Sequence, residues 1–338
     1  MRVFLVFIGM CFVLPLFGQN TGINPIQEAT ASKHLCQPGI LNKSRSRGID
    51  IAYNYNSGGN LHQPGDQFRL PISQVNSIES FILKVRVPVV LRPNLKVLLG
   101  YYYTPETYRF GEIAPFSTFQ EAFTSLDNQR LKSNAFSVYV TGSLTEKMYT
   151  VARFRLLYNG DYRQWINFDQ RYALYNAAAM LGIKENEHFE WGVGLVYTRN
   201  FHRQLLLPFV MINKNFNEKW GIEAVPPVYM FGRYNINAKN ILLFGTEFNN
   251  QHYAIDIPNR TTGMASPYYV THSEIMGVVS LERQLVPWVW LNIKGGYQHN
   301  LDTRFRAASP AASTFQISPA SGLFFRLGIF VSPPDSMK

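Results

Sequence analysis

Apolar and polar side chains alternate along most of the chain with a period of two residues. In 81-FILKVRVPVVL-91 the odd positions from Phe81 to Val89 are apolar, and Lys84 and Arg86 stand between them. Successive side chains of a β-strand point to opposite faces, so this strand has one apolar and one cationic face. A soluble sheet would bury the apolar face in a core. A membrane barrel would turn it to lipid and turn the cations to a wet lumen.

The same two-residue period recurs far along the chain, in residues 134–144, 152–160, 189–197, 289–298 and 323–331. Almost no segment has the 3.6-residue period of an amphipathic helix, and the best helix candidate is 119–126, inside a connector. The pattern therefore predicts an all-β protein.

The connectors between these segments are alternately short and long. Short turns are expected at 92–94, 145–146, 185–187, 215–217, 237–239 and 285–286. Longer or Pro-marked connectors are expected at 58–77, 104–130, 160–173, 200–203, 226–227, 251–267 and 300–320. A transmembrane barrel has tight turns at one rim and longer loops at the other. The alternation of short and long connectors predicts a transmembrane antiparallel up-and-down β-barrel of about 14 strands, with 12 as the alternative. An even number of strands requires a tight turn at Pro226-Pro227.

Four segments are expected. Residues 1–18 have the charged start (Arg2), apolar run and small terminal residue (Gly18) of a secretory signal peptide. Residues 19–48 are polar and irregular, which predicts a periplasmic N-terminal segment long enough to enter the barrel as a plug. The barrel is expected over 49–332, followed by a short tail, 333–338.

The composition fits an exported membrane barrel. Only 16% of the 338 residues are charged, against roughly 25% in soluble domains, and 14% are aromatic. Beyond the leader no run of about 18 apolar residues predicts a transmembrane helix. The net charge is +10, but the cations are spread along the chain and the leader argues against nucleic acid as a partner. The expected partners are outer-membrane lipid, the barrel-assembly machinery and a small solute.

Aromatic residues gather near the predicted strand ends, as in an interfacial girdle. The alternative is that these residues are simply good strand formers. They are Tyr101, Tyr102, Tyr103, Trp191, Tyr197, Tyr268, Tyr269, Trp288 and Trp290.

No catalytic or metal motif is visible. The seven His have no ligand spacing, only Cys36 follows the leader, and G-x-S-x-G is absent. His272-Ser273 is adjacent in sequence, which does not place two side chains on one face of a strand. We therefore predict no catalytic residue, no metal, no cofactor and no enzymatic activity, with a lipid-modifying enzyme as the weakest alternative.

Six cations are predicted to face the lumen by the alternation: Lys84, Arg86, Arg153, Arg155, Lys294 and Arg326. On the lipid face each would cost roughly 2–4 kcal/mol near the bilayer midplane. They have two interpretations. They pair with inward acids such as Glu190 and Glu282 and close the lumen, or they line a solute pathway that favours anions.

Four stretches resemble an uncharacterised outer-membrane β-barrel family, a domain of unknown function, of Bacteroidota-type bacteria. They are 16-LFGQN-20, 81-FILKVRVPVVL-91, 232-GRYNINAKNILLFGTEF-248 and 322-GLFFRLGIFV-331. The resemblance covers roughly 49–331 and implies a barrel in the bacterial outer membrane, with no assigned activity. Phe330 is followed by eight residues, unlike the terminal aromatic of many such barrels.

The leading functional expectation is a channel or transporter for small anionic or amphiphilic solutes. The alternative is a non-conducting structural or adhesive barrel that acts through its extracellular loops.

Overall fold

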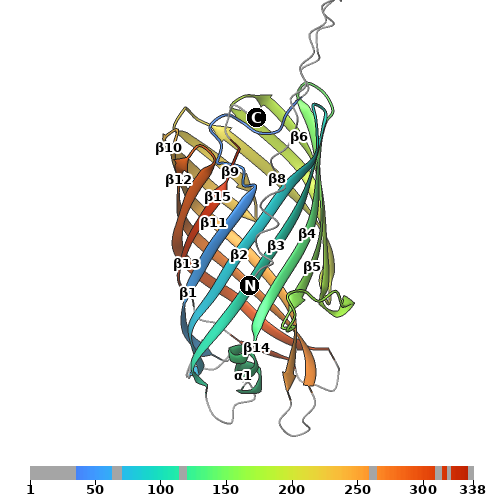
Figure 1. Ribbon diagram of the computed structural model, residues 1–338, viewed down its shortest axis with the longest axis vertical. Coiled ribbons are helices and arrows are strands. Elements are labelled where there is room, and N and C mark those ends of the chain that lie inside the picture. The colour runs from blue at the N-terminus through green and yellow to red at the C-terminus, as the bar shows by residue number, and fades with distance from the viewer. Residues whose placement is uncertain are drawn as a thin grey trace, which may run out of the picture. The chain divides into compact units, whose positions relative to one another are not determined.

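The computed structural model describes residues 36–62, 71–113, 120–258, 265–308, 314–317 and 321–333. These residues form an antiparallel β-barrel (Figure 1). Its strands are β1 (Ile49–His62), β2 (Pro71–Arg92), β3 (Leu95–Ile113), β4 (Arg130–Ser143), β5 (Met148–Gly160), β6 (Ala173–Asn186), β7 (Phe189–Arg199), β8 (Gln204–Asn215), β9 (Trp220–Val225), β10 (Tyr229–Asn237), β11 (Asn240–Pro258), β12 (Ala265–Val286), β13 (Val289–Ala307), β14 (Phe315–Ile317) and β15 (Gly322–Val331).

The barrel closes between its first and last strands. From β1 to β13 each strand pairs with the next, β13 also pairs with β15, and β15 pairs with β1 from Ile49↔Val331 to Asn56↔Phe324. The three-residue β14 pairs with β13 alone, so fourteen of the fifteen described strands make the wall. The prediction of a 14-stranded barrel is confirmed, as is the turn at Pro226-Pro227, which separates β9 from β10.

Exposure alternates along the wall strands in the sense expected of a membrane barrel. In β15, Leu323, Phe325, Leu327 and Ile329 are 46–67% exposed, whereas Phe330 is fully buried. In β2, Phe81, Val87 and Val89 are exposed on the outer face. An apolar outer face is unfavourable in water and favourable in lipid, so this surface fits a bilayer.

The strands at one side of the barrel run farther than the alternation predicts. Both β2 and β12 have 22 residues, and most of the expected connector 58–77 is strand, with Gly59 opposite Val75. Strand ends that project beyond a membrane need no apolar outer face, so their sequence loses the two-residue pattern.

Two short helices interrupt the long connectors. α1 (Gln120–Asn128) overlaps the predicted helix 119–126 and lies at the long-loop end of the barrel (Figure 1). The 3-10 helix η1 (Gln170–Tyr172) precedes β6. No helix among the described residues is long and apolar enough to cross a membrane.

Candidate functional site in the barrel lumen

A polar cavity of about 370 Å³ occupies the middle of the lumen; we call it the central cavity. Its lining combines two cations, Lys84 and Arg326, with three carboxylates, Glu106, Glu247 and Glu274. Amide side chains, among them Asn54, Asn56, Asn249, Gln251 and Gln298, complete the polar surface. Such a lining offers water and polar groups many partners, and apolar residues such as Ile82 and Met276 make up the rest of the surface.

The carboxylates of the central cavity have partners within the wall. Glu247 accepts from Lys294 Nζ at 2.5 Å. Glu274 lies 3.0 Å from His272 Nε2 and accepts from Asn249 Nδ2 at 2.9 Å. Glu106 accepts from Gln251 Nε2 at 3.1 Å. These contacts hold the negative charge of the cavity against its own wall.

The two cations of the central cavity have weaker partners. Lys84 makes no ion pair with any described residue, and Arg326 has only a 3.4 Å contact from Nε to Asn54 Oδ1. A buried cation without a counterion is costly, and an anion that enters the cavity would offset that cost.

A second group of cations lies on the inner face of β2 and β5, around Tyr102 and Tyr139. Arg86 Nε donates to the Tyr102 hydroxyl at 2.7 Å, and the Arg155 guanidinium stands 4.6 Å from the Tyr102 ring centroid. The hydroxyl groups of Tyr102 and Tyr139 share a short hydrogen bond. We call these residues the arginine–tyrosine cluster.

The arginine–tyrosine cluster lacks carboxylates. Arg153 Nη2 donates to the amide oxygen of Asn176 at 2.8 Å, and neither Arg86, Arg153 nor Arg155 makes an ion pair with a described residue. The Nε groups of Arg153 and Arg155 are buried without a hydrogen-bond acceptor. The cluster therefore places three cationic side chains on the inner face without a described counterion.

All six sequence-predicted cations therefore lie on the inner face, in two places. Lys84, Lys294 and Arg326 lie around or beside the central cavity, and Arg86, Arg153 and Arg155 form the other cluster. Of the six, only Lys294 makes an ion pair within the described part of the chain. Three residues assigned to the girdle are also inside: Tyr102 is 6% and Trp290 is 2% exposed, and Tyr268 packs against the buried apolar cluster beside α1. Their even positions put them on the inner face, which proximity to a strand end does not reveal.

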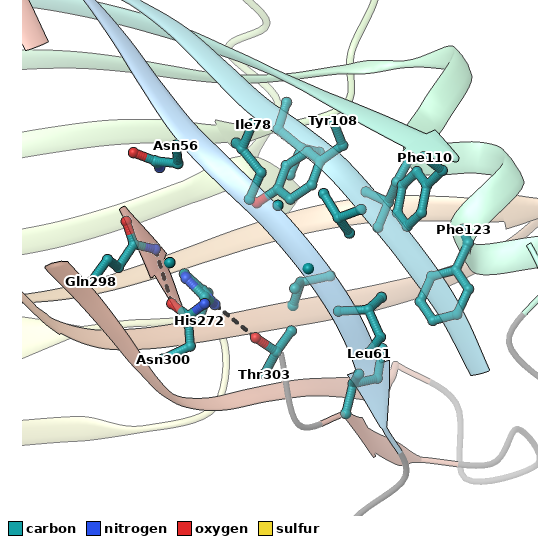
Figure 2. A pocket seen from close by; sticks show the side chains of 18 of the residues that line it. Asn56, Leu61, Ile78, Tyr108, Phe110, Phe123, His272, Gln298, Asn300 and Thr303 are labelled. Atoms are coloured by element: carbon teal, nitrogen blue, oxygen red, sulfur yellow. Dashed lines mark hydrogen bonds between the residues drawn. The ribbon is translucent and has the colours of Figure 1, made fainter. Parts of the chain in front are cut away.

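An apolar compartment adjoins the central cavity on the side of α1, and Figure 2 shows side chains that line it. Its free volume is about 70 Å³, and Phe123 and Leu126 of α1 pack there against Tyr253, Phe305 and other buried side chains. Ile78, Tyr108 and His272 line both this compartment and the central cavity. His272 is held in place by Thr303 Oγ1, 2.6 Å from Nδ1. The lumen thus passes directly from an apolar to a polar region.

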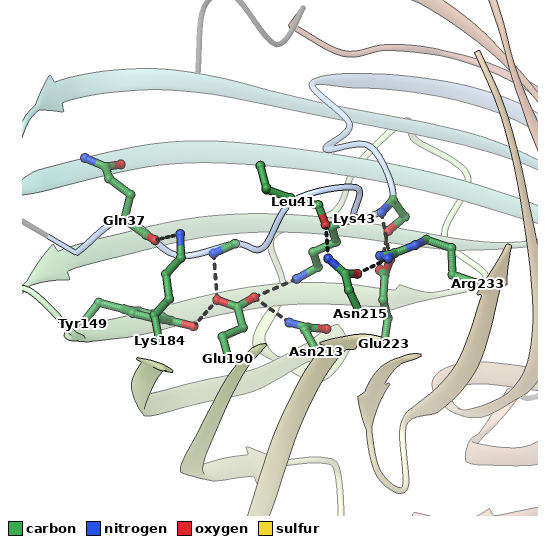
Figure 3. Close-up of polar contacts among 12 residues, drawn as sticks. Gln37, Leu41, Lys43, Tyr149, Lys184, Glu190, Asn213, Asn215, Glu223 and Arg233 are labelled. Carbon is green, nitrogen blue, oxygen red and sulfur yellow. Dashed lines mark hydrogen bonds and ion pairs between the residues drawn. The ribbon is translucent and has the colours of Figure 1, made fainter. Parts of the chain in front are cut away.

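Residues 36–48 cross the short-turn mouth of the barrel, and we call them the mouth strap (Figure 3). Cys36 N–H donates to the carbonyl of Thr145 in the β4–β5 turn at 3.0 Å, and Leu41 N–H to that of Glu187 in the β6–β7 turn at 2.9 Å. At the other end Gly48 N–H donates to Val331 of β15 at 2.8 Å. The remainder of the predicted N-terminal segment, 19–35, lies outside the described residues.

Buried carboxylates on the inner wall fix the mouth strap. Glu190 of β7, 1% exposed, accepts from Gly39 N–H at 2.7 Å and from Lys43 Nζ at 3.4 Å. Glu223 of β9 accepts from the N–H of Ser44 at 2.8 Å and from its hydroxyl at 2.5 Å. The strap is therefore held by charge-assisted hydrogen bonds, which are stronger than neutral ones.

The far half of the strap is held by two arginines. Arg47 pairs with Glu282 of β12 at 2.6 Å and stands 4.4 Å from the Phe330 ring centroid. Arg45 stands over the Trp290 ring at 5.1 Å. Glu190 and Glu282 are inward as expected, but their pairing with the six lumen cations is wrong: their partners belong to the strap.

Sequence reasoning missed the strap contacts, although two signals for them were present. Cations alternate in 43-KSRSR-47, and single inward Glu residues stand near the short-turn ends of three strands, at 190, 223 and 282. Among the described residues no group of three His, Cys, Asp or Glu side chains could hold a metal ion.

The barrel is similar in fold to solved outer-membrane proteins. It has 10% identity and a TM-score of 0.44 with the COG4313 outer membrane channel from Pseudomonas putida F1, over 92% of this chain and 100% of that one. With the P. putida toluene transporter TodX the values are 8% and 0.38, over 85% and 89%. With a Pseudomonas aeruginosa FadL homologue they are 10% and 0.31, over 84% and 90%. No curated protein matches the chain in sequence.

A family model matches residues 117–329, which is 213 of the 338 residues. The match names no host lineage, so the expected Bacteroidota-type origin stays a prediction. The chain belongs to the family described as domain of unknown function DUF6268.

Proposed function

We propose that this protein is a barrel of the bacterial outer membrane that takes up a small anionic amphiphile into its lumen. The apolar tail of the solute would occupy the compartment beside α1, and its anionic head would reach the cations of the central cavity and the arginine–tyrosine cluster. The mouth strap would close the periplasmic exit.

The observation that carries this proposal is the imbalance of partners in the lumen. Five of the six inward cations lack an ion pair with any described residue, whereas Glu106, Glu247 and Glu274 all have donors. The unpaired positive charge lies next to an apolar compartment that shares five lining residues with the central cavity. Rings of Arg and Lys favour anions.

The proposal is tested by the anion/cation reversal potential of the refolded protein in a planar bilayer. Arg153→Gln/Arg155→Gln keeps two polar side chains of similar reach and removes two charges from the lumen. We expect this variant to lose most of the anion preference. The control is Arg109→Gln, since Arg109 is 61% exposed and pairs with Glu79 at 2.9 Å, outside both lumen groups. An unchanged reversal potential in the Arg153/Arg155 variant would reject an anion pathway at this cluster.

The rival function, a non-conducting barrel that acts through its loops, is favoured by one observation. α1 and its apolar neighbours fill the long-loop end, while the strap crosses the other mouth. The two functions differ in a single readout. The rival predicts a folded barrel that never conducts and never binds an amphiphile.

A further inference from the structure

The barrel wall is incomplete beside β8. β9 has six residues, and it pairs with β8 only from Ile212↔Ala224 to Asn215↔Gly221. β8 continues to Gln204, and among the described residues this part of it is paired with β7 alone. Residues 204–211 therefore present a free strand edge on the side where β9 and β10 end early (Figure 1).

β11 does not close this gap. Its last contacts with β10 are Tyr229↔Glu247 and the hydrogen bond from Phe248 N–H to the carbonyl of Val228, 2.9 Å. Farther along, β11 bonds to the end of β5 instead, with Ala254 opposite Gly160. Phe201 in the β7–β8 loop stacks on Tyr269 of β12 at 4.7 Å. Hence the backbone ladder of the wall is broken in a region framed by β8, the β9–β10 turn, β11 and the β7–β8 loop; we call this region the wall window.

The central cavity reaches the wall window. Val228, 50% exposed, lines the cavity from the β9–β10 turn. Phe248 also lines it, although its register partner Ile275 is 41% exposed on the outer face of β12. The cavity therefore extends to β11 at the end of its ladder with β10, which is one border of the wall window.

The chemistry of the window is mixed. Leu205, Leu206 and Leu207 are 40%, 62% and 48% exposed, and as consecutive strand residues they cover both faces of β8. Beside them run unpaired backbone groups, which hydrocarbon cannot satisfy and which occur at membrane depth only beside water or protein. Leu206 is nine residues from Asn215 at the short-turn end, inside the roughly 9–11 residues of a membrane span.

We infer that the wall window is a lateral portal through which an amphiphile passes between the central cavity and the surrounding lipid. The leucines contact the tail, and the free strand edges and bound water accommodate the polar head. This route rests on the proposed uptake of an amphiphile, and it explains how a solute passes although α1 and its neighbours pack the long-loop end.

The test uses a thiol placed in the window of the folded protein. Leu207→Cys in a Cys36→Ser background is labelled in detergent with a bimane and reconstituted. We expect quenching both by lipids with brominated chains and by iodide in water. A label at Leu195→Cys, on the outer face of β7 and 51% exposed, is the matched control and should respond to the lipids alone. If iodide does not quench the label at 207, water does not enter the wall window, and the portal is rejected.

The second measurement is transport. A benzyl adduct on Leu207→Cys should slow the association of dansyl-labelled undecanoate about tenfold, and the same adduct on Leu195→Cys should not. An equal rate with the window blocked overturns the portal and leaves the proposed function intact. No undecanoate binding to the unmodified protein overturns the proposed function, and the iodide result then decides the portal by itself.

Discussion

Glu190→Gln should release the mouth strap without removing a large side chain. The carboxylate accepts four donors: Gly39 N–H and Lys43 Nζ from the strap, and the Tyr149 hydroxyl and Asn213 Nδ2 from the wall, at 3.0 and 2.7 Å. A Gln amide replaces one acceptor oxygen by an NH2 donor. At least one of these donors would then face another donor.

The free energy by which Glu190→Gln destabilises the docked strap is worked out from the contacts of Glu190 with the strap alone. A hydrogen bond to a charged group contributes about 1.5–3 kcal/mol. The Lys43 side chain is 30% exposed, so its pair with Glu190 is screened and adds less than about 1 kcal/mol. The sum is about 1.5–4 kcal/mol, and about 2.8 kcal/mol, near its middle, is a hundredfold change in the population of the released strap.

Hydrogen exchange of peptides that cover residues 39–44 measures this release directly. We expect exchange about a hundredfold faster in Glu190→Gln. The control is Glu185→Gln: Glu185 is exposed and accepts from Trp191 Nε1 at 3.2 Å, and it does not contact the strap. Unchanged exchange at 39–44 in a variant that still migrates as a folded barrel would refute the anchoring role of Glu190.

Two further predictions concern the strap thiol and an outer loop. Burial raises the pKa of the Cys36 thiol, so alkylation by iodoacetamide should need a higher pH in the native protein than in the unfolded chain. Glu190→Gln should shift the pH profile of alkylation toward that of the unfolded chain. Identical profiles for the native and the unfolded protein would contradict docking of the strap. Lys132 Nζ donates to the three carbonyls of residues 162–164 at 2.8–2.9 Å, so Lys132→Met should speed tryptic cleavage after Arg163 about tenfold, and an unchanged rate would show that the loop is held otherwise.

The barrel itself is predictable from sequence because its cause is local. Lipid outside and a wet lumen inside impose a period of two on every membrane span, as Phe81 to Val89 show against Lys84 and Arg86. Turn length then distinguishes the two ends of the barrel. The alternation of short and long connectors places a turn at Pro226-Pro227. The inner side of each of the six cations follows from the same rule.

The features that decide the site depend on contacts far apart in sequence. Glu190 meets Gly39 across 151 positions, so alternation can place it inside but cannot name its partner. The short length of β9 leaves no trace in the pattern of Leu205–Leu207, which are simply apolar. The place of Trp290 at a strand end suggests a girdle residue, but its even position puts it on the inner face of β13. There its ring packs under Arg45 of the strap.

The most direct test of a lumen pathway closed by the mouth strap is single-channel conductance after residues 36–47 are replaced by a Gly/Ser linker of equal length. The wall strands begin at Ile49, so the barrel should still close. We expect a larger and steadier conductance than in the intact protein, with anions preferred. A folded, heat-modifiable barrel that conducts no better without its strap would contradict it.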